Sequence, residues 1–253
     1  MPGTRTCRIG TSGYEYPHWR GIFYPEDLPR KRWFGFFAEH YDTVEVNNTF
    51  YRLPAKRVFD AWREQAPAGF LYALKFSSYG THRKRLREPA EPIERFVGRA
   101  RRLESHLGPI LVQLPPRWRC NLERLTDFVA RLPASLRWAI EFRDPSWLCT
   151  EVFDLLSAHR IALCVHDLLP RHPRLATADF VYLRFHGGDY AGSYSRQFLA
   201  AEARRIRQDL AADRDVFAYF NNDLHGHALH NALDLKRYVA AGRAAATRLE
   251  ASL

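Results

Sequence analysis

Strand-like and helix-like patterns alternate along the whole chain, and this alternation restricts its fold more than any other feature. Short apolar runs of strand character recur eight times, and amphipathic segments with apolar residues at three- and four-residue spacing lie between them. Strands that alternate with helices form parallel sheets through crossover connections. Eight such units in 253 residues match the size of a TIM barrel, so we predict one TIM-like (β/α)8 barrel domain over residues 1–253.

The expected elements follow from these patterns. The predicted strands are residues 7–12, 43–50, 70–77, 109–115, 137–143, 162–167, 180–186 and 216–222. The predicted helices are residues 32–40, 55–65, 93–107, 122–132, 198–212 and 227–241. An open doubly wound sheet is the alternative, but such a sheet usually carries a glycine-rich phosphate loop after its first strand. The stretch GTSGYEYPHWRG lacks that spacing, which favours the barrel.

Polar side chains alternate with apolar ones in the predicted strands. In TVEVNNTF (43–50), the valines share one face, whereas Glu45, Asn47 and Thr49 share the other. One face of a barrel strand meets the helices and the other meets the interior, so we expect the polar face to point inward. The same alternation places further side chains inside the barrel near the carboxyl ends of the strands, where barrel enzymes build their sites. They are Lys75, Gln113, Glu141, Arg143, Arg184, His186, Tyr219 and Asn221.

Four inward residues are the predicted catalytic groups. Glu45 and Glu141 are two carboxylates that can serve as acid and base. Lys75 is one of only five lysines among 38 basic residues, and it offers a titratable amine that an arginine does not. His186 is a candidate for proton transfer. Two alternatives are an ion pair between Lys75 and Glu45, and a polar layer whose charges neutralise one another without chemistry.

Substrate contacts are predicted from the remaining inward polar residues and from loops at the same end. They are Asn47, His82, Gln113, Arg143, Arg184, Tyr219, Asn221, Tyr14 and Trp19. Tyr14 and Trp19 belong to an aromatic cluster after the first strand, whose rings either stack on a sugar or nucleobase or form a packed lid. Glycines, hydroxyls and backbone donors in HGGDYAGSYS (186–195) and NNDLHGHA (221–228) precede helices beside Arg184, which predicts an anion site.

A metal site is the alternative that histidines and carboxylates suggest. Glu141, Asp167 and His186 follow successive strands and offer oxygen and imidazole ligands, but the inward cations would repel a divalent metal. The histidines of HGHALH (225–230) fit a solvent-facing surface equally well. The four cysteines have neither zinc-site nor disulfide-scaffold spacing. We therefore predict neither a metal nor another cofactor.

The charge balance indicates the kind of partner. A net charge of +10 favours anions, so we expect a small anionic substrate or nucleic acid as the partner. The densest basic segment is THRKRLRE (81–88), which follows the third predicted strand. The sequence has no signal-peptide pattern and no run of about 18 apolar residues, which predicts a cytoplasmic protein without a membrane partner. Nothing in the pattern indicates an oligomeric state.

Seven motifs together resemble the YecE-like family, also called domain of unknown function 72. They are IGTSGYEYPHWRGIFYP, VEVNNTFYRLP, LKFSSYGTHRKRL, LGPILVQLPP, EFRDPSW, YLRFHGG and AYFNND. The resemblance covers residues from about 8 to 240 and implies a TIM-like barrel, but it brings no established reaction. From the residues themselves we predict an enzyme that performs acid–base chemistry on an anionic, ring-containing substrate, such as a sugar phosphate, a nucleotide or a nucleic-acid fragment. The alternatives are a non-catalytic nucleic-acid or metabolite binding protein and a metal-dependent isomerase- or endonuclease-like barrel.

Overall fold

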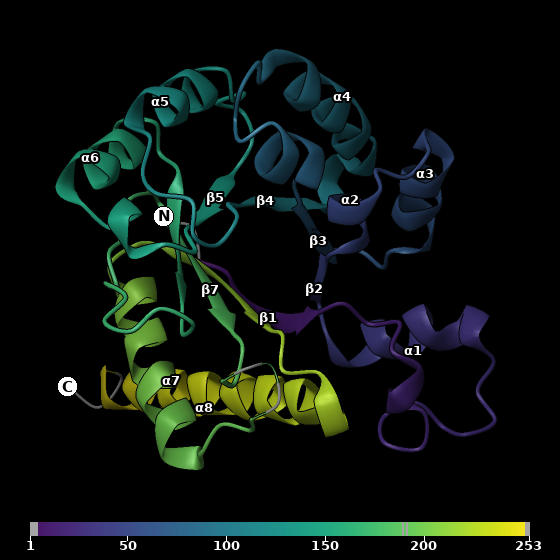
Figure 1. The fold of residues 1–253 in the computed structure, drawn as a ribbon. Coiled ribbons are helices and arrows are strands. Elements are labelled where there is room, and N and C mark those ends of the chain that lie inside the picture. The colour runs from purple at the N-terminus through teal and green to yellow at the C-terminus, as the bar shows by residue number, and fades with distance from the viewer. Residues whose placement is uncertain (1–4, 189, 191, 251–253) are drawn as a thin grey trace.

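Eight parallel strands pair in sequence order and close into a barrel, because the last strand also pairs with the first. The computed structural model describes residues 5–188, 190 and 192–250, the last eight of these by their backbone alone. The strands are β1 (Cys7–Ser12), β2 (Thr43–Val46), β3 (Leu71–Lys75), β4 (Leu107–Gln113), β5 (Trp138–Glu141), β6 (Ala162–His166), β7 (Phe180–Phe185) and β8 (Asp215–Phe220). Helices surround this ring of strands, as Figure 1 shows. The predicted TIM-like fold is confirmed.

The helices lie on the outside of the barrel and differ in length. The α-helices are α1 (Trp33–His40), α2 (Asn48–Tyr51), α3 (Lys56–Gln65), α4 (Ala90–Ala100), α5 (Leu122–Ala130), α6 (Thr150–Ala158), α7 (Arg196–Ala211) and α8 (His227–Glu250). The short turns are η1 (Pro17–Trp19), η2 (Arg30–Arg32), η3 (Tyr79–Arg83), η4 (Arg101–His106), η5 (Pro145–Trp147) and η6 (Leu224–Gly226). No helix of the described residues is long and apolar enough to cross a membrane.

The crossover from β6 to β7 contains no helix between residues 167 and 179, so the prediction of strict alternation is wrong at this place. The segment is fastened by polar contacts instead. Arg174 pairs with two acidic residues of α7, at 2.7 Å to Glu202 and 3.0 Å to Asp209. Thr177 Oγ1 accepts the backbone N–H of Leu163 at 2.8 Å, which attaches the segment to β6.

The strand β2 ends earlier than TVEVNNTF predicts. Val46 is its last residue, and the short helix α2 begins at Asn48. Thr49 Oγ1 donates to the carbonyl oxygen of Lys75 at 2.7 Å, which fixes α2 against the end of β3. Thr49 is therefore a structural residue of the turn, and the prediction that it faces inward on a strand is wrong.

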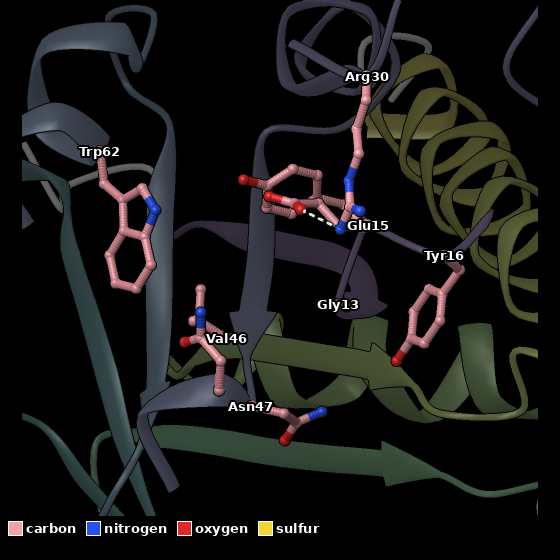
Figure 2. Close-up of a pocket in the computed structure, with 9 residues that line it drawn as sticks. Gly13, Glu15, Tyr16, Arg30, Val46, Asn47 and Trp62 are labelled. Carbon is pink, nitrogen blue, oxygen red and sulfur yellow. Dashed lines mark hydrogen bonds and ion pairs between the residues drawn. The ribbon is translucent and has the colours of Figure 1, made fainter. Parts of the chain in front are cut away.

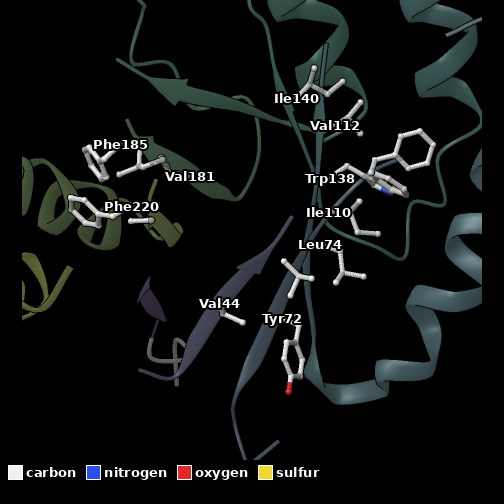
Figure 3. Packing of buried hydrophobic residues seen from close by; sticks show 14 of the residues in the cluster. Val44, Tyr72, Leu74, Ile110, Val112, Trp138, Ile140, Val181, Phe185 and Phe220 are labelled. Carbon is white, nitrogen blue, oxygen red and sulfur yellow. The ribbon is translucent and has the colours of Figure 1, made fainter. Parts of the chain in front are cut away.

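The outward faces of the strands form the larger apolar core. Val44, Leu74, Val112 and Ile140 are buried in a cluster that reaches from the strands to the helices, and Figure 3 shows these side chains along neighbouring strands. Removing this apolar surface from water stabilises the fold by roughly 25 cal/mol for each Å² buried. The predicted outward orientation of the apolar face is observed at each of these positions.

A smaller apolar cluster fills the middle of the barrel interior. Its members are Ala73, Leu111, Ala139, Ala162, Cys164, Phe180, Tyr182, Phe217 and Tyr219. The small side chains come from β3, β5 and β6, and the large rings come from β7 and β8, so the interior is packed rather than hollow. At the amino end, Arg137 Cζ lies 5.5 and 5.6 Å from the ring centroids of Phe180 and Phe217. Its Nη2 lies 2.7 Å from Asp215 Oδ2, so an ion pair closes this end.

Candidate active site at the carboxyl end of the barrel

A network of charged side chains fills the carboxyl end of the interior. Arg184 of β7 lies between Glu45 of β2 and Glu141 of β5. Its Nη2 is 2.8 Å from Glu45 Oε1, and its Nη1 is 2.6 Å from Glu141 Oε2. All three residues are at most 2% exposed. Because an unpaired buried charge is costly, the guanidinium and the two carboxylates serve as counter-charges for one another.

Further donors complete the bonding of both carboxylates. Glu45 accepts from the Tyr182 hydroxyl at 2.6 Å and from the Ser12 hydroxyl. Glu141 accepts from Arg143 Nη1 at 2.6 Å. The sequence reasoning missed Ser12 and Tyr182 as members of this network. Inward alternation is the signal that would have found both residues, on β1 for Ser12 and on β7 for Tyr182, which shares a strand face with Arg184.

The carboxylates of both glutamates are bonded to arginines. Burial alone would raise the pKa of Glu141, but Arg184 and other neighbouring cationic groups hold it well below its usual value. Every carboxylate oxygen of Glu45 and Glu141 accepts at least one hydrogen bond. Arg184 thus occupies the space between the two carboxylates that were predicted as acid and base.

Lys75 brings an unpaired amine to the same end of the barrel. Its Nζ lies 4.2 Å from the ring centroid of Phe50, and no described carboxylate forms an ion pair with it. The ion pair with Glu45 that the sequence left open is not formed, because Arg184 takes that carboxylate. Burial, and then Arg184, lower the pKa of Lys75 to about 8. Both the charged and the neutral amine are therefore accessible near neutral pH.

His186 is held in one orientation by Asp167, which follows β6. Its Nδ1 lies 3.0 Å from Asp167 Oδ1, and the same carboxylate accepts the backbone N–H groups of His186 and Gly187. The Tyr194 hydroxyl also donates to this carboxylate. Since Nδ1 donates its hydrogen to Asp167, the lone pair of the neutral ring lies on Nε2. That atom is buried and has no hydrogen-bond partner among the described residues.

The titration of these two groups suits proton transfer. Burial lowers the pKa of His186 below its usual value, although the hydrogen bond that its ring donates to Asp167 acts in the opposite direction. Burial would raise the pKa of Asp167, but its hydrogen bonds with His186 and Tyr194 hold that pKa well below its usual value. A neutral imidazole beside an ionised carboxylate is the arrangement of a general base.

Arg143 connects the buried charges to the outer rim. Its Nη1 binds Glu141, and its Nη2 donates to the Tyr190 hydroxyl at 2.8 Å. The Tyr190 ring lies 5.2 Å from the ring of His186, in an edge-on arrangement. Tyr190 is 37% exposed, so this rim is open to solvent. Arg143 thus lies where a ligand at His186 would meet a positive charge.

His82 of η3 contacts the ring of Phe50, which Lys75 also contacts. Burial, followed by the charges of Lys75 and Arg143, lowers the pKa of His82 to about 4. Its ring packs edge-on against Phe50 at 4.9 Å, and its Nδ1 lies 2.9 Å from Thr81 Oγ1. His82 is therefore a neutral group at pH 7 that borders the same cationic environment.

A cavity of about 340 Å³ opens beside Asn47, between the loops that follow β1 and β2. Figure 2 shows the ion pair between Glu15 and Arg30 at its edge, with a distance of 2.9 Å. Tyr14 also lines this cavity. Asn47 Nδ2 donates to Ser12 Oγ at 2.9 Å, which connects the cavity to the charge network. Asn47 Oδ1 is buried without a partner among the described residues and is available to a ligand.

Several predicted contacts lie elsewhere. Trp19 is fully buried, and its Nε1 donates to the carbonyl oxygen of Asp223 at 3.0 Å, so it belongs to a packed lid. Tyr219 faces inward but is fully buried in the apolar cluster, with its hydroxyl 2.8 Å from Thr43 Oγ1. The polar atoms of Trp19 and Tyr219 thus already bond within the protein, so neither offers an unpartnered group to a substrate. Gln113 and Asn221 are half-buried at their strand ends without a side-chain hydrogen bond to a described residue.

A family model described as protein of unknown function DUF72 matches residues 8–252. The chain belongs to this family. The UPF0759 protein YecE of Escherichia coli K12 is 30% identical over 145 residues, which are 55% of this chain and 49% of YecE. The match thus spans about half the length of that curated relative. The UPF0759 protein YunF of Bacillus subtilis 168 is 23% identical over 252 residues, which cover 82% of this chain and 86% of YunF.

Solved structures extend the similarity of this DUF72 chain to three dimensions. A DUF72 protein of Thermotoga maritima has a TM-score of 0.83 at 26% identity, covering 93% of this chain and 99% of that one. A DUF72 protein of Enterococcus faecalis V583 has a TM-score of 0.79 at 21% identity, covering 93% and 96%. D-psicose 3-epimerase of Clostridium cellulolyticum H10 has a TM-score of 0.54 at 11% identity, covering 92% and 96%. The last similarity is one of barrel fold.

The groups predicted to bind an anion after β7 of this DUF72 barrel are bonded within the protein. The backbone N–H groups of His186 and Gly187 donate to Asp167, and Arg184 binds two glutamates. Residues 189 and 191 of the predicted loop lie outside the described residues. Arg184 and these two amides are thus already bonded, and the anion site predicted from the loops after β7 and β8 stays a prediction. Lys75, together with Arg143, retains the cationic character of this end.

The side chains considered as metal ligands are also bonded within the protein. Glu141 binds two arginines, and Asp167 binds His186. No group of three His, Cys, Asp or Glu side chains in the described part of the chain has the arrangement of metal ligands. The histidines of residues 225–230 are among the described residues for which this holds.

Proposed function

We propose that this DUF72 barrel is an enzyme in which His186 acts as general base on an anionic, ring-containing substrate. The observation that carries the proposal is the buried, unpartnered Nε2 of a ring whose Nδ1 is held by Asp167. The neighbouring His166 provides the contrast, because its Nε2 bonds the carbonyl oxygen of Phe142 and its Nδ1 accepts the N–H of Leu168. His166 thus has both ring nitrogens bonded, as most buried polar groups do, and His186 does not.

Lys75 and Arg143 support the anionic character of the substrate. At pH 7 an amine with a pKa of about 8 is mainly protonated, and Lys75 has no described counter-ion. Arg143 is fixed by Glu141 and reaches the rim beside Tyr190. The exposed ring of Tyr190 supports a ring-containing substrate, because such rings stack on aromatic side chains. Sugar phosphates, nucleotides and nucleic-acid fragments meet both requirements.

In the proposed reaction, His186 Nε2 accepts a proton from an acidic C–H or O–H of the substrate. Asp167 stabilises the imidazolium that forms, and Lys75 with Arg143 stabilises the negative charge left on the substrate. The imidazolium then returns its proton to the product, which restores the neutral ring. The buried glutamates take no proton in this scheme and hold the guanidinium groups in position.

The test is turnover of a panel of sugar phosphates and nucleotides in D₂O, with mass spectrometry of products and of deuterium incorporated into carbon. We expect His186→Gln to lower the rate by about 10² to 10⁴, the typical contribution of a general base, and Asp167→Asn to lower it as well. His159→Gln, at the exposed end of α6, is the matched control and should retain full activity. Equal turnover by wild type and His186→Gln contradicts the proposal, as does a panel on which the wild type is inert.

A further inference from the structure

A second cavity lies outside the barrel, where the loop after α2 and the first turn of α3 meet α4. Its volume is about 490 Å³. Four of its eight lining residues are arginines, namely Arg52, Arg57, Arg95 and Arg99, and none is acidic. The remaining lining residues are alanine, leucine, proline and valine. We call this cavity the arginine cleft.

The positive charge of the arginine cleft is largely uncompensated. Arg52 and Arg57 are exposed, and their side chains form no ion pair or hydrogen bond with a described residue. Arg95 has one contact with Glu91 at 3.8 Å, and both side chains are more than half exposed, so the pair is weak. Three of the four guanidinium groups are therefore available to an anion.

The fourth arginine gives the cleft a fixed donor. Arg99 Nη1 donates to the carbonyl oxygens of Leu53 and Pro54, and both of these residues line the cavity. An arginine held by two carbonyls loses less side-chain entropy when a ligand binds than a free arginine does. A planar guanidinium with remaining N–H groups matches the oxygen geometry of a phosphate.

Arginines further along the same helices are paired in the ordinary way. Arg63 of α3 binds Glu104 at 2.5 Å, and Arg102 of η4 binds Asp60 of α3 at 2.6 Å. The surface between α3 and the α4–η4 segment thus carries matched charges at one end and unmatched arginines at the other. This contrast within one surface distinguishes the arginine cleft from a generally basic face.

We propose that the arginine cleft binds a phosphate group carried on a ring-containing molecule. The guanidinium groups of Arg57 and Arg95 approach the phosphate from two different helices, and the apolar wall of Pro54 and Val58 packs against the ring. The exposed Tyr51, which directly precedes Arg52, offers a further stacking surface. The site is separate from the barrel mouth, because Arg57 and Arg95 contact none of the residues assigned to proton transfer.

The test is calorimetric titration at low salt with three probes: inorganic phosphate, adenosine monophosphate and a single-stranded oligonucleotide of ten residues. We expect adenosine monophosphate to bind more tightly than inorganic phosphate. The double variant Arg57→Gln/Arg95→Gln should weaken this binding tenfold or more. The control variant Arg196→Gln/Arg204→Gln removes two exposed arginines of α7 that have no described partner, so the net charge falls equally. It should change the affinity less than twofold.

The outcomes separate a built site from general attraction. Equal weakening by the two double variants would overturn the proposal, and so would the failure of every probe to bind. Tighter binding of inorganic phosphate than of adenosine monophosphate would contradict the proposal that the ligand contains a ring. If Arg57→Gln/Arg95→Gln weakens oligonucleotide binding far more than monophosphate binding, the ligand of the cleft is a nucleic-acid strand. The reverse result indicates that the ligand is a free nucleotide. Thermal unfolding of each variant establishes that the fold is retained.

Discussion

The two ends of the barrel interior each contain an arginine and its carboxylate partner, and they differ in what these groups leave unbonded. At the amino end, Arg137 pairs with Asp215 and has a partly exposed side chain. At the carboxyl end, Arg184 is almost fully buried and binds Glu45 and Glu141 together. The carboxyl end also holds buried polar atoms without a described partner, at Asn47 Oδ1, Arg184 Nε and His186 Nε2.

This difference in burial supports the proposal that a ligand binds at the carboxyl end. At the amino end, Arg137 pairs with Asp215 and Arg8 pairs with Asp42, and both arginine side chains are partly exposed. Arg8 Nε and Asp42 Oδ1 are buried there without a hydrogen-bond partner among the described residues. Burying several charges at the other end gives little net stability, because desolvation offsets most of their attraction. The polar end is therefore best explained by chemistry, and the following predictions test the contrast between the two ends.

The largest effect is expected from Arg184→Met. It leaves Glu45 and Glu141 buried without their shared counter-charge, which costs about 3 to 5 kcal/mol of unfolding free energy. Urea unfolding at pH 7 measures the loss, with Arg204→Met on the exposed face of α7 as the control. A loss below about 1 kcal/mol would show that water or rearrangement compensates the carboxylates, and the contrast between the two ends would fail.

Leu111→Ala in the apolar cluster should cost about 3 kcal/mol, within the range of buried leucine truncations, because it leaves a cavity. Unlike Arg184→Met, it should leave the titration of His186 unchanged, since Leu111 belongs to the apolar cluster. NMR of the imidazole signals between pH 4 and 8, combined with urea unfolding, measures both properties. A changed pKa of His186 would show that the apolar cluster and the network of charged side chains are coupled.

The lowered pKa of Lys75 predicts that the free energy of unfolding rises with pH. Its folded pKa is about 8 and its ordinary value is 10.5, so between these values the unfolded chain binds a proton that the folded protein has released. Raising the pH through this window should stabilise the wild type relative to Lys75→Met, by at most about 1.4 kcal/mol per pH unit. Urea unfolding of both proteins from pH 7 to 10 provides the comparison, with Lys56→Met on α3 as control. If the difference in unfolding free energy between the wild type and Lys75→Met does not change with pH, Lys75 is solvated in the folded protein.

The smallest effect is expected at the rim. Tyr190→Phe removes the hydroxyl that accepts from Arg143 Nη2, and it should cost about 0.5 to 1 kcal/mol or less, because the side chain is partly exposed. If the rim binds substrate, the same change should raise KM more than it lowers kcat. A stability loss as large as that of Leu111→Ala would assign Tyr190 to the core instead.

The sequence predicted the direction of each side chain better than its partner. A strand alternates with period two, so Glu45, Lys75 and Glu141 were assigned to the interior from local pattern alone. The choice between Lys75 and Arg184 as the partner of Glu45 depends on strand stagger and on side-chain reach across the barrel. Neither quantity is encoded in a short stretch of sequence.

The depth of a side chain within the barrel and the geometry of the loops also could not be predicted from the sequence. Tyr219 faces inward as predicted, but it lies in the apolar cluster rather than among the polar groups. Asp167 follows the last residue of β6, where the alternation rule no longer applies and the backbone turn sets the direction of the side chain. Its bond with His186 could therefore be found only in three dimensions, although both residues were separately noted as candidates.

The crossover without a helix between β6 and β7 makes the proposed catalytic pair sensitive to ionic strength. Asp167 begins this segment, and Arg174 fastens it to α7 through partly exposed ion pairs instead of through a hydrophobic helix face. Added salt screens such pairs but hardly affects apolar packing. High salt should thus loosen the alignment of His186 while the barrel itself remains folded, so activity would decline well before the protein melts.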